Sequence, residues 1–105
     1  MEITIERNHS PVLVLLSGAL DNPDAHDGLR RSVEPLLNEQ GHSVVVDMAE
    51  VARINSEGLG VLASLGARSN LRGGSLVWAR PSIYVDQVLR LTKLSTFLTI
   101  APDRA

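Results

Sequence analysis

Hydrophobic and polar residues alternate at the start of the chain, in the pattern of a strand with one buried face. Ile3 and Ile5 are flanked by polar residues, and an apolar run at residues 12–16 follows the turn signal Asn-His-Ser-Pro at residues 8–11. Ser17-Gly18 closes this run. The pattern therefore predicts a β-hairpin.

From residue 24 the apolar period lengthens to three and four, which is typical of an amphipathic helix. Its apolar face comprises Ala25, Leu29, Val33, Leu36 and Leu37. Either Asn22 or Asp24 suits the N-cap. Pro35 lacks a backbone donor, so we expect a kink or a break near Glu34, and Gly41 should end the element.

The rest of the chain alternates short apolar runs with helical patterns. In order, these are a buried strand at 44–46, a linker at 48–54, a helix from Ser56 or Glu57 to the glycine pair at 73–74, a strand at 75–79, a helix opened by Pro81-Ser82 and an edge strand at 97–100. Strands separated by helices need crossover connections. We therefore expect an α/β fold in which a mixed four- to five-stranded sheet carries three or more helices, mainly on one face.

Composition limits the classes of function. A chain of 105 residues that is 44% hydrophobic fits one domain over residues 1–105. The net charge is −2 and the longest basic cluster is Arg30-Arg31, so nucleic acid is not an expected partner. No signal sequence is recognisable, and no segment approaches the roughly 20 apolar residues that span a bilayer, so we expect no membrane insertion. The absence of cysteine favours the cytoplasm.

Candidate catalytic residues are few. His9, His26 and His42 have polar or turn-like neighbours, and we interpret them as exposed loop residues. Gly58 and Gly60 lack the lysine of a phosphate-binding loop and the third glycine of a dinucleotide site. We interpret them as small residues that let a helix approach the sheet closely. The sequence thus predicts no catalytic residue, no cofactor and no metal.

The most informative segment is the polar cluster Asn55-Ser56-Glu57, which separates a predicted strand from an apolar helix and is followed by Gly-Leu-Gly. Ser56 stands where a helix N-cap belongs. The segment resembles the loop of the STAS domain, the family of sulphate-transporter tails and anti-sigma-factor antagonists, in which this loop typically reads Asp-Ser-Ser-Gly-Leu-Gly. The spacing matches without a gap.

Other parts of the chain resemble the same family in the correct order. The matching segments are residues 17–21 (the family's Gly-x-Leu-Asp), 44–47 (its Val-x-x-Asp strand), 73–77 (its glycine turn and fourth strand) and 88–97 (its last helix and exit). The resemblance therefore covers nearly the whole chain.

The resemblance implies a function and a site. In free-standing members of the family, the first serine of the loop is phosphorylated by a partner that is both an anti-sigma factor and a kinase, and that serine aligns with Ser56. The implied function is an anti-sigma-factor antagonist that binds this kinase when unmodified, with a phosphatase as a second partner. The expected partner-binding residues are Asp21, Asn22, Asn55, Ser56, Glu57, Gly58 and Leu59.

A charge on Ser56 has a clear physical consequence. A phosphate at a helix start meets unsatisfied backbone N–H groups and the positive end of the helix dipole, so the fold should tolerate it. About two added negative charges beside Glu57 should weaken partner binding by repulsion and by the cost of desolvation. Alternatively, Ser56 only caps the helix, a role worth about 1 kcal/mol.

Three positions depart from the family pattern. Asn55 replaces an acidic residue and removes a charge beside the phosphoacceptor, while Glu57 replaces a small hydroxyl residue and partly imitates a negatively charged state. Lys93 stands where the family often has glycine, which predicts either a helix end without a left-handed residue or a strained one. These departures affect the expected regulation more than the fold.

Other functions compete with the antagonist hypothesis. A constitutive STAS subunit of a transporter or scaffold complex would use Ser56 as a contact without phosphorylation, and Asn55 and Glu57 favour this alternative. Binding of a nucleotide or lipid at the loop is a third hypothesis, and an enzyme is the last. The sequence specifies neither the partner's identity nor the oligomeric state.

Overall fold

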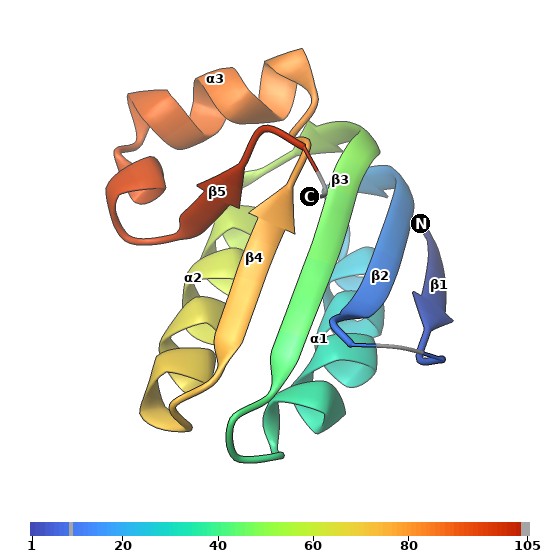
Figure 1. Cartoon of the computed structure of the whole chain (residues 1–105). Coiled ribbons are helices and arrows are strands. Elements are labelled where there is room, and N and C mark those ends of the chain that lie inside the picture. Colours follow the sequence, from blue (N-terminus) through green and yellow to red (C-terminus); the bar gives the residue numbers. More distant parts are fainter. Residues whose placement is uncertain (9, 104–105) are drawn as a thin grey trace.

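The five strands form one mixed sheet whose order follows the chain, β1-β2-β3-β4-β5 (Figure 1). The computed structural model describes residues 1–8 and 10–103, so the interpretation of His9 lies outside the described residues. The elements are β1 (Glu2–Glu6), β2 (Val12–Leu20), α1 (Pro23–Leu37), β3 (Ser43–Ile54), α2 (Ser56–Leu71), β4 (Ser75–Ala79), α3 (Ile83–Leu91), the 3-10 turn η1 (Leu94–Thr96) and β5 (Thr99–Ala101). β1 and β2 form the predicted antiparallel hairpin, and the later pairs are parallel.

Helices α1 and α2 lie side by side behind the sheet, and α3 lies across the end at which β4 finishes (Figure 1). One hydrophobic core joins the helices to the sheet. Its fully buried members include Leu29 of α1, Leu62 of α2, Leu89 of α3, Val14 of β2, Val46 of β3 and Trp78 of β4. The predicted mixed sheet with helices mainly on one face is therefore confirmed.

The third strand is much longer than the pattern of residues predicts. β3 runs through the segment expected to be a linker and ends at Ile54. The pairing register with β2 shifts twice along this stretch, and each shift places one extra residue in β3. Buried residues there recur every three positions, at Met48, Val51 and Ile54, rather than every two. The bulges hide the alternation that would have revealed the strand.

The first helix is continuous where a break is predicted. α1 is capped by Asn22, whose side chain accepts a hydrogen bond of 2.9 Å from the Ala25 N–H, and it continues through Pro35 to Leu37. Pro35 falls in the last turn, which Leu36 and Leu37 anchor by burial in the core. That burial offsets the missing hydrogen bond.

The end of α3 takes the strained form of the two predicted alternatives. Lys93, which follows the cap residue Thr92, has a φ of +62° in the left-handed region.

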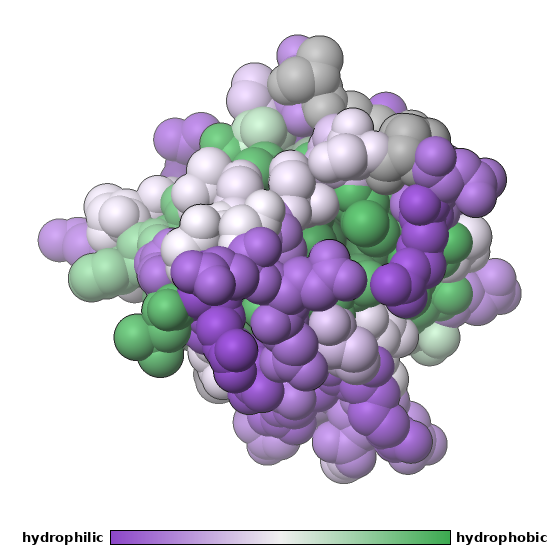
Figure 2. Space-filling model, turned by 60° about the horizontal axis from the view of Figure 1, so that its bottom comes forward, coloured by the Kyte–Doolittle hydropathy of each residue, from purple (hydrophilic) through white to green (hydrophobic). Residues whose placement is uncertain are grey.

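Among the described residues, no helix has the length and apolar character needed to cross a membrane. Viewed from the end at which α2 finishes, the surface is largely hydrophilic, with hydrophobic residues in small separate areas (Figure 2).

Candidate functional site

The predicted site residues come together at one edge of the sheet, where two neighbouring parallel strands end. Leu20 is the last residue of β2 and pairs with Ile54, the last residue of β3. The backbone N–H of Asn55 donates a 3.3 Å hydrogen bond to the Leu20 carbonyl. The loop after β2 and the loop after β3 are therefore adjacent, which brings the Asp21 region beside the Ser56 region.

The N-cap of α2 is Asn55 and not Ser56. Asn55 has extended backbone angles, and its Oδ1 accepts a 2.8 Å hydrogen bond from the Gly58 N–H. Ser56 is the first helical residue, one position later, and it is exposed. The alternative in which Ser56 only caps the helix is therefore wrong, because the capping contact belongs to its neighbour.

His26 is buried against this cap, so its interpretation as an exposed loop residue is wrong. Only 3% of the residue is exposed. Its Nε2 lies 3.1 Å from Asn55 Oδ1 and 3.4 Å from the Leu20 carbonyl oxygen. Both partners are acceptors, so Nε2 carries the hydrogen and donates it. His26 thus ties α1 to the ends of both strands.

A sequence signal for the burial of His26 exists. His26 precedes Leu29 by three residues, and Leu29 precedes Val33 by four, so His26 continues the apolar face of α1. A polar residue on such a face is either a satisfied buried group or part of a site. Here it is both buried and bonded to the residue that begins α2.

The other ring nitrogen of His26 faces a charged surface residue. Nδ1 lies 3.7 Å from Glu57 Oε2, and the Glu57 side chain is 78% exposed. Glu57 also stands in the first turn of α2, where a carboxylate interacts favourably with the helix dipole. A carboxylate therefore stands next to Ser56 in the first turn of α2.

The two glycines of the loop differ in their surroundings. A Cβ at Gly58 would lie 2.6 Å from the Leu20 carbonyl oxygen and 2.8 Å from Ile54 Cγ1, so Gly58 permits the close approach that the sequence predicts. A Cβ at Gly60 would meet nothing within 4 Å, and Gly60 is exposed, so the same interpretation is wrong there. Leu59 packs into the core. Gly58 and Leu59 therefore support the loop from inside.

Asp21 fastens the neighbouring loop. Its carboxylate accepts a 3.1 Å hydrogen bond from Arg53 Nε near the end of β3. This hydrogen bond holds the pKa of Asp21 below its ordinary value, and a weaker one from Asn22 acts in the same direction. Asn22, Arg53, Ser56 and Glu57 have exposed side chains at this edge, while Asp21 and Asn55 are half-buried.

Comparison with known proteins gives the family. Residues 3–100 match the family model described as "Mlab, STAS domain". The comparison with curated proteins finds no match.

Several solved structures share the fold. An anti-sigma-factor antagonist (STAS) domain protein from Planctomyces limnophilus is 13% identical, with a TM-score of 0.80 over 97% of this chain and 91% of that one. The anti-sigma factor antagonist SpoIIAA in its unphosphorylated form is 17% identical, with a TM-score of 0.74 over 95% and 88%. Bacillus SpoIIAA in its phosphorylated form is 16% identical, with a TM-score of 0.70 over 95% and 91%. With the family model matching nearly the whole chain, this protein belongs to the STAS-domain family.

Proposed function

We propose that this protein is an anti-sigma-factor antagonist. Its unmodified form binds an anti-sigma factor that is also a serine kinase, and phosphorylation of Ser56 ends the binding. The observation that carries the proposal is the position of Ser56 as the exposed first residue of α2, with the cap supplied by Asn55. The Ser56 hydroxyl is not needed to begin the helix, so it can be modified without the loss of a capping bond.

The helix start can accept a phosphate. The first turn of a helix presents backbone N–H groups without intrahelical partners, and the helix dipole is positive there. A phosphate on Ser56 would add about two negative charges to a surface that already carries the Glu57 carboxylate. The fold should therefore persist while binding to the partner weakens. SpoIIAA, which has the same fold, is known in both the unphosphorylated and the phosphorylated form.

The binding surface we propose is the edge where β2 and β3 end. Asn22, Ser56 and Glu57 would contact the partner directly, with Asp21 and Asn55 at the base of the surface. Gly58 and Leu59 would act from inside by fixing the path of the loop. A phosphatase would restore the unmodified form. The absence of cysteine favours the cytoplasm as the place where the protein acts.

A second candidate is a constitutive subunit of a transporter or scaffold complex. Glu57 favours it, because its carboxylate lies against His26 and gives the loop a permanent negative group next to Ser56. In this case Ser56 contacts the partner and remains unmodified.

One experiment separates the two candidates. The unmodified protein is used to capture partners from its own cells, the recovered complex is incubated with ATP, and the Ser56 peptide is examined by mass spectrometry. Recovery of an ATP-binding kinase together with phosphate on Ser56 supports the antagonist. Recovery of transporter or scaffold subunits with an unmodified peptide supports the constitutive subunit.

Binding of the recovered kinase is then measured with a charged variant. We expect Ser56→Asp to weaken binding by about tenfold or more, with a melting temperature within a few degrees of the parent protein, because the charge acts at the surface. Ser64→Asp is the matched control, since Ser64 is an exposed serine about 12 Å further along the same helix. Equal binding by the parent protein and Ser56→Asp would contradict the switch.

A further inference from the structure

The sheet has one free edge that is long enough to accept another strand. β1 is the outermost strand, and among the described residues it pairs only with β2, over all five of its residues and without a bulge (Figure 1). In an antiparallel pair, every second residue directs its backbone N–H and C=O away from the partner strand. These groups of β1 therefore point to the position that a further strand would occupy.

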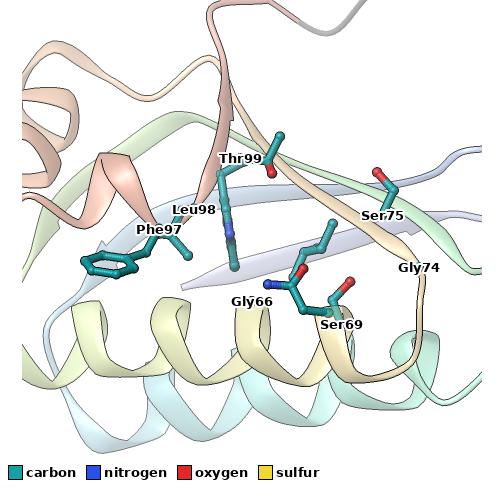
Figure 3. Close-up of a pocket in the computed structure, with 10 residues that line it drawn as sticks. Gly66, Ser69, Gly74, Ser75, Phe97, Leu98 and Thr99 are labelled. Atoms are coloured by element: carbon teal, nitrogen blue, oxygen red, sulfur yellow. The ribbon is translucent and has the colours of Figure 1, made fainter.

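The opposite edge of the sheet offers less to a further strand. β5 is only three residues long. The segment that leads into it lies over α2, and Leu98 Cδ2 would be 2.9 Å from a Cβ at Gly66 (Figure 3). β5 thus presents few backbone groups, and β1 is the edge that can pair over a useful length.

The two faces of β1 carry different side chains. Ile3 and Ile5 pack against the core that the helices cover. Glu2, Thr4 and Glu6 are exposed on the other face of the strand. A second copy of the chain does not suit this edge, because antiparallel pairing about Thr4 would place Glu2 of each copy opposite Glu6 of the other, and like charges directly opposite are destabilising.

An open hollow of about 270 Å³ lies beside β1 on the face that the helices leave uncovered. Its walls include Glu2 of β1 and Glu50 of β3, which pair in register with Ser17 of β2 from opposite sides. Two strand spacings, about 10 Å, therefore separate the Cα atoms of the two glutamates. Thr4 and Leu15, which form the neighbouring pair, also line the hollow.

The hollow has an excess of negative charge. Asp47 is buried and is paired with Arg80, whose Nε lies 3.2 Å from Asp47 Oδ2. Among the described residues, neither Glu2 nor Glu50 forms an ion pair. Both glutamates are exposed, so a ligand can reach them from solvent. The hollow therefore suits a positively charged group that enters beside β1.

We propose that the edge of β1 binds an extended basic segment of a partner protein, which adds a strand to the sheet. Backbone hydrogen bonds to β1 would supply affinity, and alternate lysine or arginine side chains would supply specificity. Such a side chain carries its charge at the end of a long apolar stem. The stem would lie along Thr4 and Leu15, with the charge between Glu2 and Glu50. The proposal does not depend on the proposed function, because it uses none of the residues around Ser56.

The test is an NMR titration of the full chain with a hairpin peptide. The peptide carries the strand Arg-Val-Thr-Val-Arg before an Asn-Gly turn, which preorganises that strand. We expect saturable shifts of the backbone amide signals of β1, with a dissociation constant of about a millimolar or lower. Two control peptides should give no saturable shift: one with glutamate in place of arginine, and one N-methylated at the outward amides of the strand. No response to the arginine peptide, or an equal response to the N-methylated one, would overturn the proposal.

Variants of exposed residues check the role of charge. Glu2→Lys combined with Glu6→Lys should weaken binding of the arginine peptide by about tenfold or more and should permit binding of the glutamate peptide. Glu50→Gln, which leaves β1 unchanged, should weaken binding of the arginine peptide by about threefold. Asp86→Asn is the matched control, because it removes one carboxylate from α3 and should leave the affinity unchanged.

Two results with these proteins would also overturn the proposal. The first is unchanged affinity for the arginine peptide in the folded Glu2→Lys and Glu6→Lys double variant, because the glutamates would then play no part in recognition. The second is a set of concentration-dependent shifts of the β1 amides in the protein alone, because a second copy of the chain would then occupy the edge.

Discussion

The two ends of α2 are fixed by the same kind of contact, a buried histidine, but with different partners. At the first turn, His26 donates to Asn55, the residue that caps the helix. At the last turn, His42 accepts from Ser69 and donates to the Glu39 carbonyl. Each histidine therefore joins α2 to the preceding part of the chain, His26 from α1 and His42 from the residue before β3.

The difference lies in the second ring nitrogen. Both nitrogens of His42 are bonded to uncharged groups in its immediate surroundings. In His26, by contrast, Nδ1 faces the carboxylate of Glu57, whose side chain is mostly exposed. The first turn of α2 therefore places a buried histidine next to an exposed charged side chain. Within the described part of the chain, His42 has no charged partner, so the two ends of α2 differ in whether their histidine faces a charged side chain.

The largest expected effect on stability comes from substitution of the glycine near each end of α2, which are Gly58 and Gly74. A Cβ at Gly58 would press on the Leu20 carbonyl oxygen at 2.6 Å, and a Cβ at Gly74 would collide with the ring of His42. Neither neighbour is the free end of a flexible side chain. We expect Gly58→Ala and Gly74→Ala each to lower the free energy of unfolding by about 1–3 kcal/mol, measured by urea denaturation.

Gly60→Ala is the control for both glycine variants. Its Cβ would meet nothing within 4 Å, and alanine favours a helix more than glycine does. The variant should be as stable as the parent protein or up to about 1 kcal/mol more stable. A similar loss of stability in all three variants would mean that the glycines share a general role and that neither end depends on close packing.

The cap of α2 gives the next largest effect. Asn55→Ala removes the oxygen that receives the Gly58 N–H and the His26 donor, so we expect the free energy of unfolding to fall by about 1 kcal/mol. Ser56→Ala changes only an exposed side chain at the following position and should stay within about 0.5 kcal/mol of the parent protein. If Ser56→Ala lost more stability than Asn55→Ala in thermal and urea unfolding, Ser56 and not Asn55 would be the capping residue.

Much of the fold follows from local patterns in the sequence. Apolar residues at every second position predict the hairpin, and apolar residues at every third or fourth position predict the three helices and their order. These signals can be recognised because they depend only on neighbours in the chain. The same signals fail in β3, where two bulges change the period of the buried residues. The family resemblance predicts the site loop, but a shift of one residue separates the predicted cap Ser56 from the actual cap Asn55.

The roles of the histidines could not be predicted in the same way. His26 meets Asn55 across 29 positions of the chain, and His42 meets Ser69 across 27. Such contacts exist only after the helices pack together, so turn-like neighbours in the sequence gave the wrong interpretation for both residues. Only the position of His26 on the apolar face of α1 carried a local signal.

The ion pair of Asp21 and Arg53, which lies at the same edge of the sheet as the first turn of α2, provides the test with the smallest expected effect. Arg53 lowers the pKa of Asp21 in the folded protein, so the folded state favours the ionised carboxylate. The resulting stabilisation is complete above the ordinary pKa of about 4 and is lost as the pH falls through the lowered folded value. Asp21→Asn lacks this contribution at every pH.

The difference in unfolding free energy between the parent protein and Asp21→Asn should therefore be small at neutral pH and should vanish on acidification. Urea denaturation at about pH 7 and about pH 3 measures it on both sides of the ordinary carboxylate pKa. Arg53→Gln is the matched control, because it removes the other member of the same pair and should abolish the difference at both pH values. A difference that persists unchanged at low pH, or in the Arg53→Gln background, would show that Asp21 acts through its shape and not through its charge.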